Sequence, residues 1–281
     1  PVGTFRVQIP ANGGRYGGSV SNHTANWIEL EGAVNVRDVG GLPADDGRRV
    51  RTGVLIRSAN LQTVTEADVA RLVDGLAVRR VLDLRTDIEV SSLQPGPMHA
   101  QPDVAIHHLS LYPDDGAGET DPTRALNAVL PWHGERVSSD YPPTVASYLR
   151  YLQRRPDSIL AALRAIAEPD GATVVHCAAG KDRTGMVVAL ALSVVGVSPA
   201  VIAADYAETQ SQIGRIIDQL ASCGIYDREV TRPDQIPPAT TDTMLAVLAA
   251  IDAEHGGVLA WLTGHGWTEA DTQRLRTKLL A

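Results

Sequence analysis

The chain has 281 residues, 44% of them hydrophobic, so it can enclose a sizeable core and indicates one large domain. Its net charge of -8 argues against a general nucleic-acid-binding protein, which would carry a basic excess over its phosphate-facing surface. Two cysteines are too few for a disulfide framework. Because the chain is acidic overall, any affinity for phosphate must come from a local site.

No stretch reaches the roughly 18 apolar residues of a membrane span. The longest apolar candidate, Met186 to Val197, has the length of a buried core helix. The N-terminal sequence PVGTFRVQIPANGG has no basic region followed by an apolar one, so no signal peptide is visible. We expect a cytoplasmic protein without a transmembrane segment, and export without a visible signal peptide stays open.

Residues 1–26 are rich in Gly, Ser and Asn and predict an extended lead-in, with FRVQI as an edge strand, before a single domain at 27–281. Short β-branched runs typical of strands in a covered sheet follow at 53–57, 78–84, 104–111 and 172–176. A helical pattern at 65–75 begins with Thr65 as its N-cap and stops at Gly75.

The segment 112–141 carries several Pro, Gly and Asp residues and predicts a long irregular insertion. Helical patterns follow at 143–154, 158–167, 199–220, 241–254, 257–263 and 268–280. Strands that alternate with helices predict an α/β fold with a central, mostly parallel sheet flanked by helices. The amphipathic, then proline-containing segment 199–240 is a candidate lid over a crevice, and a packed helical layer is the alternative.

The stretch TVVHCAAGKDRTGMVVAL, residues 173–190, holds Cys177 between a strand pattern and a helix pattern. The turn from Ala178 to Lys181 therefore leads into a helix N-terminus, where backbone N–H groups and the helix dipole form a cradle for an anion. Arg183, six residues after Cys177, adds a planar donor that matches two phosphate oxygens. A thiol in such surroundings ionises more readily than a free one and becomes a nucleophile.

This combination predicts in-line attack by Cys177 on a phosphomonoester, giving a phosphocysteine that water then hydrolyses. We expect the Thr184 hydroxyl to donate to the thiolate and the His176 imidazole to orient the loop. The residues expected to bind the phosphate are Ala178, Ala179, Gly180, Lys181, Thr184 and Asp83.

Two competing interpretations of the loop are weaker. A cysteine after a strand is usually a small core residue, but the spacing of Gly180 and Arg183 argues against that here. A nucleotide-binding P-loop requires Gly at 175 and Ser or Thr at 182, where Val175 and Asp182 stand.

The loop HCAAGKDRTG resembles the H-C-x-x-G-x-x-R-[ST]-G signature of the cysteine-dependent protein tyrosine phosphatases. Its AGKDRTG form is similar to a bacterial tyrosine and phosphoinositide phosphatase family that has a mycobacterial member. The likeness extends over roughly residues 28–280, through NVRDVGGL, VLIRSANL, VLDLRTDIEV and the C-terminal GGVLAWLTGHGWTEADTQRLRTKLL. The resemblance implies Cys177 as nucleophile, Arg183 as phosphate clamp, and no metal or organic cofactor. Low-molecular-weight phosphatases and arsenate reductases fit poorly, because their cysteine lies near the N-terminus.

The general acid stays open between three aspartates, because no Trp-Pro-Asp tripeptide, its source in many tyrosine phosphatases, occurs in this sequence. Asp182 is favoured, since the resemblance implies that the matching position serves as the acid in the bacterial family. Asp83 ends a strand and is expected at the carboxyl edge of the sheet. Asp114 follows the strand at 104–111, where the acid loop of the wider superfamily falls. The structural alternatives are an ion pair with Arg57 or Arg85 for Asp182, and a loop cap for Asp83.

We expect phosphotyrosine proteins as substrates. Phosphoinositides are a further candidate, because Lys181 adds a cation at the loop rim and related phosphoinositide phosphatases carry lysine there; a solvent-exposed lysine is the alternative. A small-molecule phosphomonoester fits the supply of just 12 aromatic residues, and a non-catalytic phosphate-binding module is the last alternative. The expected partners are a phosphorylated protein, lipid or small molecule, with inorganic phosphate as product and no nucleic acid.

Three remaining features favour structural roles. Arg57, and Arg85 with Glu89, either steer phosphate or form ion pairs, and ion pairs are favoured. The eight histidines lack partners at metal-site spacing. Cys223 is interpreted as a buried inert thiol in preference to a redox partner of Cys177.

Overall fold

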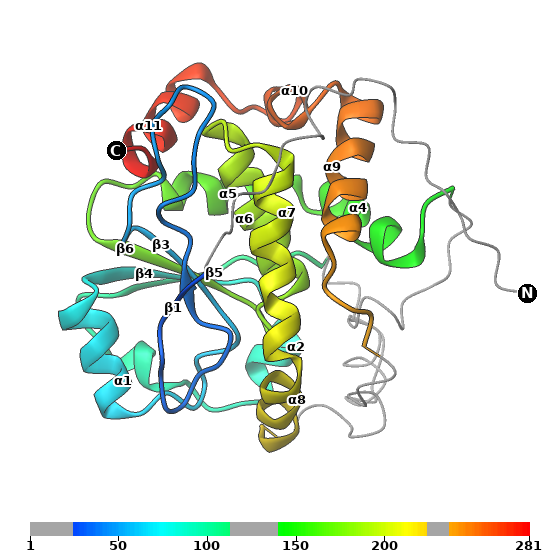
Figure 1. The fold of residues 1–281 in the computed structure, drawn as a ribbon. Coiled ribbons are helices and arrows are strands. Elements are labelled where there is room, and N and C mark those ends of the chain that lie inside the picture. Colours follow the sequence, from blue (N-terminus) through cyan, green and yellow to red (C-terminus); the bar gives the residue numbers. More distant parts are fainter. Residues whose placement is uncertain (1–24, 113–139, 224–235) are drawn as a thin grey trace, which may run out of the picture.

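The computed structural model describes residues 25–112, 140–223 and 236–281, and its centre is a six-stranded sheet (Figure 1). The strand order is β1-β2-β3-β6-β4-β5. The strands are β1 (Asn26–Trp27), β2 (Arg37–Asp38), β3 (Leu55–Ser58), β4 (Val78–Asp83), β5 (Ala105–His108) and β6 (Ala172–His176). β3, β6, β4 and β5 are parallel, whereas β1 and β2 add an antiparallel edge. The predicted mostly parallel sheet is confirmed.

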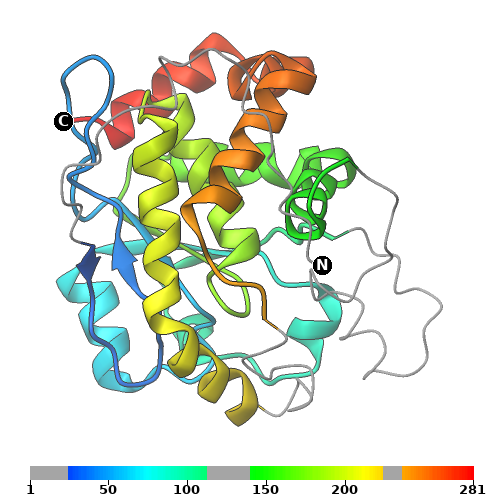
Figure 2. The same ribbon diagram turned by 45° about the vertical axis from the view of Figure 1, so that its right-hand side comes forward.

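The helices cover both faces of this sheet and enclose two cores (Figures 1 and 2). The smaller core lies under α1 (Glu66–Ala70) and its π-helical continuation η1 (Arg71–Gly75). The larger core is built with α4 (Pro143–Arg154), α5 (Pro156–Ile166), α6 (Asp182–Val194), α7 (Pro199–Glu208), α9 (Thr241–His255), α10 (Val258–Gly264) and α11 (Glu269–Leu279). Adjacent residues of β6 serve opposite cores: Val174 packs in the smaller and Val175 in the larger. The alternation leaves all of β6 buried at the centre of the molecule.

One predicted helix, 199–220, is in fact broken into α7, the 3-10 turn η3 (Thr209–Gln212) and α8 (Ile213–Ser222). A side chain from β2 binds at this break. The Arg37 guanidinium donates to the Asp205 carbonyl over 2.7 Å and to the Thr209 hydroxyl over 3.1 Å, and the Thr209 N–H bonds to the Ala207 and Tyr206 carbonyls. An i→i+3 bond of this kind tightens the backbone into a 3-10 turn.

Some elements have the predicted bounds, and four short ones were not predicted. The bounds of α4 and β6 match the predicted ranges, and Thr65 caps α1 through a capping box. The edge strands β1 and β2, the 3-10 turn η2 (Pro97–Ala100) and the helix α2 (Asp87–Ser91) were not predicted. The predicted FRVQI strand lies outside the described residues, as does nearly all of the predicted insertion.

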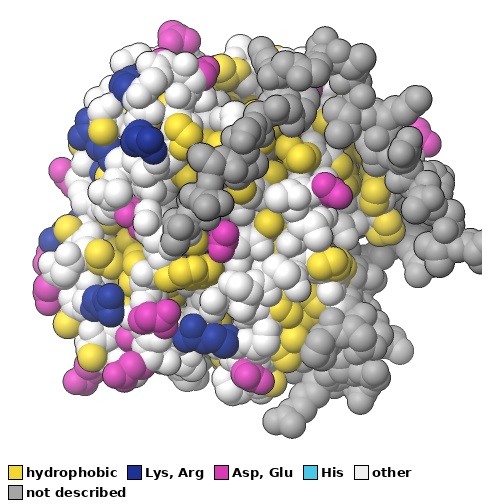
Figure 3. All heavy atoms as spheres, viewed as in Figure 1, with side chains coloured by type: hydrophobic (Ala, Val, Ile, Leu, Met, Phe, Trp, Pro, Cys, Tyr) yellow, Lys and Arg dark blue, Asp and Glu magenta, His cyan; other side chains and the backbone are white. Residues whose placement is uncertain are grey.

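The described helices include none that is long and apolar enough, by itself, to cross a membrane. Only α9 and α10 taken together pass a length-and-composition test, and they are bent by 53° at their break. Both contribute buried side chains to the larger core. Figure 3 shows acidic and basic side chains interspersed over the described part of one face of the molecule, without a continuous basic area.

Candidate active site

The predicted cysteine loop joins the central strand to a core helix. Cys177 directly follows β6, and α6 begins at Asp182, so the loop lies at the carboxyl edge of the parallel strands, where α/β proteins bind ligands. Cys177 itself is only 1% exposed. The strand–turn–helix arrangement expected from the sequence is therefore present.

All four carbonyl oxygens of residues 177–180 accept hydrogen bonds from groups outside the loop. The pairs are Cys177 with His176 Nδ1 (3.1 Å), Ala178 with the Asn60 N–H (3.0 Å), Ala179 with Asn35 Nδ2 (3.1 Å) and Gly180 with Arg57 Nη2 (3.0 Å). These bonds turn the carbonyls away from the loop centre. Within the described part of the chain, the N–H groups of Ala178, Ala179, Gly180 and Asp182 donate to no acceptor. The loop is thus an anion cradle of the kind that its sequence predicts.

Gly180 is the one loop position that no other residue type fits. Its φ is +66°, in the left-handed region, and an added Cβ would lie 2.3 Å from the Ser58 carbonyl oxygen. The close approach lets β3 support the loop from outside.

A buried carboxylate on α7 connects two arginines beneath the loop. Asp205 accepts from Arg37 Nε over 3.0 Å and from Arg57 Nη1 over 2.7 Å. Burial alone would raise the pKa of Asp205, but Arg37 and Arg57 outweigh burial and lower it to about 2. Arg37 also donates to Asn35 Oδ1 over 2.6 Å, and Asn35 in turn donates to a loop carbonyl. Since Arg57 donates to a loop carbonyl directly, both arginines are connected to the loop. Arg57 has the structural role that the sequence favoured.

Arg183 is held by a carboxylate that sequence reasoning assigned elsewhere. Its Nη1 and Nη2 atoms donate to the two oxygens of Glu89, over 2.5 and 2.9 Å, and Glu89 is fully buried. Glu89 also caps α2 from its third position, and its carboxylate lies against Arg183, a partner that the sequence did not predict. Two parallel bonds of this kind fix the plane of a guanidinium.

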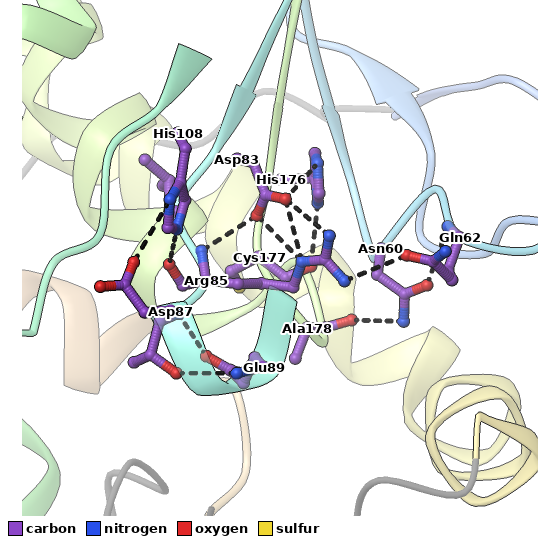
Figure 4. A network of polar contacts seen from close by, with 12 residues as sticks. Asn60, Gln62, Asp83, Arg85, Asp87, Glu89, His108, His176, Cys177 and Ala178 are labelled. Carbon is purple, nitrogen blue, oxygen red and sulfur yellow. Dashed lines mark hydrogen bonds and ion pairs between the residues drawn. The ribbon is translucent and has the colours of Figure 1, made fainter. Parts of the chain in front are cut away.

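Asp83, Arg85 and His176 form a buried cluster next to the Cys177–Ala178 peptide (Figure 4). Burial alone would raise the pKa of Asp83, but His176 and the Arg85 guanidinium outweigh burial and hold it well below its usual range. Burial lowers the pKa of His176, and its Nδ1 carries the proton given to the Cys177 carbonyl, since a carbonyl oxygen can only accept. An ionised carboxylate engaged by Arg85 is suited neither to donate a proton nor to bind phosphate. The contacts of Asp83 therefore favour a support for the loop over the expected phosphate ligand.

Asp182 has surroundings unlike those of Asp83. The Tyr148 hydroxyl donates to Asp182 Oδ1 over 2.5 Å, and Lys181 Nζ lies 3.4 Å from the same oxygen. The ion pair with Arg57 or Arg85, considered as a structural alternative, is not formed, since those arginines bind Asp205 and Asp83.

Lys181 and Thr184 have surroundings that the sequence did not predict. Lys181 was interpreted as a rim cation or an exposed side chain, but it is 1% exposed and donates to the Pro237 carbonyl over 2.6 Å. This bond ties the loop to the chain that precedes α9. The Thr184 hydroxyl is fully buried and has no hydrogen-bond partner among the described residues, so the predicted bond to the Cys177 sulfur is not formed in this structure.

The remaining candidates lie outside the site or outside the described chain. Asp114 falls in the segment 113–139, of which nothing is described. Cys223 is half-buried, and the Asn60 amide nitrogen lies 3.9 Å from its sulfur. In the described ranges, no three His, Cys, Asp or Glu side chains gather in a group able to hold a metal ion.

Sequence reasoning missed several residues that support the loop. Glu89 had a signal, because Thr86 and Glu89 match the spacing of a capping box and so predict a helix start at the end of β4. Asn35 and Asn60 fall in the stretches NVRDVGGL and VLIRSANL that resemble the family, but neither stretch showed what they contact. Tyr148 and Asp205 had no signal, since each reaches the loop region from a distant part of the chain.

Comparisons with known proteins agree with this geometry. A family model described as the tyrosine phosphatase family matches residues 28–281. The triple specificity protein phosphatase PtpB of Mycobacterium tuberculosis is 31% identical, over 90% of this chain and 98% of its own length. A relative from Cupriavidus necator is 28% identical over 88% of this chain and 86% of its own length. A tyrosine-protein phosphatase of Nostoc commune is 28% identical over 84% of this chain and 78% of its own length.

Proposed function

Since this chain belongs to the tyrosine phosphatase family and is a phosphatase, we propose that it hydrolyses phosphotyrosine through a phosphocysteine formed on Cys177. The Cys177 thiolate attacks phosphorus while the bond to the leaving oxygen breaks, and Asp182 gives that oxygen its proton. Water then attacks the phosphocysteine, Asp182 takes a proton from this water, and inorganic phosphate leaves. The Thr184 hydroxyl donates to the departing sulfur.

The single observation that carries the proposal is the orientation of the loop around Cys177. Its carbonyls are bonded outward, which leaves the N–H groups of Ala178, Ala179 and Gly180 to face an anion. Glu89 fixes the orientation of the Arg183 guanidinium, whose planar set of N–H donors matches the oxygens of a phosphoryl group. Preorganised donors of this kind stabilise the charge of a phosphoryl transition state.

We propose phosphoinositides as a second substrate class, on narrower support. The relative from M. tuberculosis is named a triple specificity phosphatase, and the likeness of this chain to it covers nearly the full length of both. Lys181 does not add to this support, because its ammonium group is turned toward Pro237.

We also propose that residues 27–281 form the catalytic domain, and that only part of 199–240 covers the loop. Side chains of α7, including Ile202 and Tyr206, lie in the larger core, which argues against a gating role for that helix. Ile216 and Leu220 of α8 instead pack against Ala178 of the loop. The candidate lid is thereby narrowed, within the described residues, to α8 and to the segment at Pro237, whose carbonyl accepts from Lys181.

The proposal is tested by turnover of p-nitrophenyl phosphate in Cys177→Ser, with Cys223→Ser as the matched control. We expect Cys177→Ser to abolish turnover and Cys223→Ser to retain it, and rapid acid quench of the wild type to trap one phosphate on Cys177. Turnover that survives in Cys177→Ser overturns the proposal. Rates on phosphotyrosine peptides, phosphoinositides and sugar phosphates then rank the substrate classes.

A further inference from the structure

We propose that Tyr148, with Tyr206 behind it, positions the Asp182 carboxyl group so that its Oδ2 atom exchanges the catalytic proton. The inference rests on the proposed function, in which Asp182 is the general acid. Tyr148 is thereby a positioning residue, which acts on the reaction only through Asp182.

The contacts of Asp182 are divided unequally between its two oxygens. Oδ1 accepts the Tyr148 hydroxyl over 2.5 Å and lies 3.4 Å from Lys181 Nζ. Oδ2 has no partner in the described part of the chain. A carboxyl group held through Oδ1 cannot rotate freely, so Oδ2 keeps one direction and is the oxygen that carries the proton when the group is protonated.

The phenols form a directed chain. The hydroxyl oxygens of Tyr206 and Tyr148 are 2.8 Å apart, and either could donate if the pair were isolated. Because the one proton of Tyr148 points to Asp182, Tyr206 must donate to Tyr148. A donor that itself accepts a hydrogen bond is polarised and bonds more strongly.

Both phenols remain donors wherever the enzyme is folded. Burial, and then the nearby Asp182 carboxylate, raise the pKa of Tyr148 well above its usual value, and the same two causes raise the pKa of Tyr206. Tyr148 is fully buried and Tyr206 is 1% exposed, so water does not compete for these bonds. The other titratable groups that face Asp182 are Lys181, Tyr112 and Tyr151.

This arrangement has a kinetic consequence with a definite sign. A hydrogen bond donated to an ionised carboxylate stabilises that form relative to the protonated one. Deleting the hydroxyl should move the descending limb of the pH–rate profile to higher pH. It should also free the carboxyl group to rotate, so that the proton is delivered less efficiently. This should slow hydrolysis of a substrate with a poor leaving group more than hydrolysis of one with a good leaving group.

The experiment compares Tyr148→Phe with Tyr151→Phe on phenyl phosphate and p-nitrophenyl phosphate. Tyr151 is the matched control: it lies one turn further along α4, it is 2% exposed, and its ring stacks on Tyr148. Its hydroxyl pairs with Tyr112 over 3.1 Å and not with Asp182. Each variant thus deletes one buried phenolic hydroxyl from the same helix.

For Tyr148→Phe we expect kcat/KM on phenyl phosphate to fall about 10- to 100-fold, the size of one hydrogen bond to a charged group. The fall on p-nitrophenyl phosphate should be at most about threefold, since its leaving group needs little protonation. Tyr151→Phe should change both rates by the same factor and leave the descending limb in place. Equal losses on both substrates in Tyr148→Phe, with an unmoved limb, overturn the inference.

Two further variants keep the test decisive. If Tyr148→Phe does not fold, Tyr206→Phe replaces it. We then expect a smaller shift of the descending limb of the pH–rate profile, in the same direction. A descending limb that does not move counts against the inference. In an Asp182→Asn background, Tyr148→Phe should no longer alter the ratio of the two rates, and an undiminished effect there contradicts action through Asp182.

The single variants separate this inference from the proposed function. An Asp182→Asn enzyme that keeps the wild-type limb and the wild-type ratio of rates removes Asp182 as the acid. A strong Asp182→Asn phenotype beside a silent Tyr148→Phe removes only the role of Tyr148.

Discussion

The two faces of the phosphate loop are built in opposite ways. On the outer face, the four carbonyls of residues 177–180 all accept hydrogen bonds, and buried ion pairs centred on Asp205 and Asp83 support the donors. On the inner face, the four N–H groups of Ala178, Ala179, Gly180 and Asp182, the Thr184 hydroxyl and Asp182 Oδ2 lack partners among the described residues. The groups with hydrogen-bond partners support the loop, and the groups without partners are those that we propose to act on the phosphoryl group.

The contrast separates the groups that stabilise the folded loop from the groups that lower the barrier of the reaction. An unpaired buried polar group costs stability, so the inner face is held in place by the bonds of the outer face. Groups held in this way need little reorganisation when a charged phosphoryl group arrives. Changes on the outer face should therefore lower the free energy of unfolding, whereas changes on the inner face should lower rates and spare stability.

The strongest way to test this division is Asp205→Asn. The substitution leaves the guanidinium groups of Arg37 and Arg57, 0% and 1% exposed, without their counter-charge. We expect the free energy of unfolding to fall by about 3–5 kcal/mol, the usual cost of breaking a buried ion pair on one side. Urea denaturation followed by circular dichroism measures the loss.

Asp46→Asn is the control for that loss. Asp46 also sits between two arginines, Arg48 and Arg276, at 2.7 and 2.6 Å, but on the surface. Exposed pairs contribute little, so we expect its denaturation midpoint to stay close to that of the wild type. Similar losses in the two variants would contradict a special role for the outer face.

The stability difference between the wild type and Asp205→Asn should also depend on pH. Burial alone would raise the pKa of Asp205, but Arg37 and Arg57 lower it to about 2. A carboxyl group whose pKa is lowered by folding stabilises the protein fully above its unfolded value of about 4, and loses this effect as pH falls through its folded value. The stability gap between wild type and Asp205→Asn should therefore be complete at pH 7 and should shrink between about pH 4 and pH 2. Denaturation midpoints at pH 7, 5 and 3 measure it, and a gap that widens in acid is the contrary result.

Glu89→Gln tests the boundary between the two faces. Loss of the carboxylate charge loosens the Arg183 guanidinium, so we expect KM for p-nitrophenyl phosphate to rise about tenfold, with a smaller change in kcat. Inorganic phosphate should weaken as an inhibitor by a similar factor. Steady-state kinetics with phosphate inhibition give both values.

Asp271→Asn is the control for Glu89→Gln. Asp271 likewise completes a capping box, with Thr268 on α11, and pairs with Arg164 over 3.1 Å. It lies away from the loop, so we expect lower stability and an unchanged KM. A rise in KM for both variants would mean that helix capping, and not the hold on Arg183, explains the result.

The same division explains what sequence reasoning could predict. The strand, turn and helix around Cys177 are local, and the six-residue spacing to Arg183 is a local property as well, so the inner face follows from a short sequence. The outer face depends on tertiary contacts between segments that are far apart in the chain. Asn35 and Asp205 lie 144 and 168 residues from the partners Ala179 and Arg37 that they contact, and no pattern in the chain marks such pairs. Even the break after α7, where Arg37 from β2 binds, was missed.

The smallest expected effect lies on the inner face, in Thr184→Val. The Thr184 hydroxyl is buried without a partner in the described structure, so its loss should leave the denaturation midpoint unchanged or slightly raised. We expect kcat to fall about tenfold, one hydrogen bond to a charged sulfur, and a burst to show that the phosphocysteine accumulates. Thr173→Val on β6 is the matched control, since that hydroxyl is also buried and unpartnered among the described residues but precedes the loop. Its rate should be that of the wild type. Equal slowing of both variants would mean that packing around β6, rather than the Thr184 hydroxyl, governs the second step.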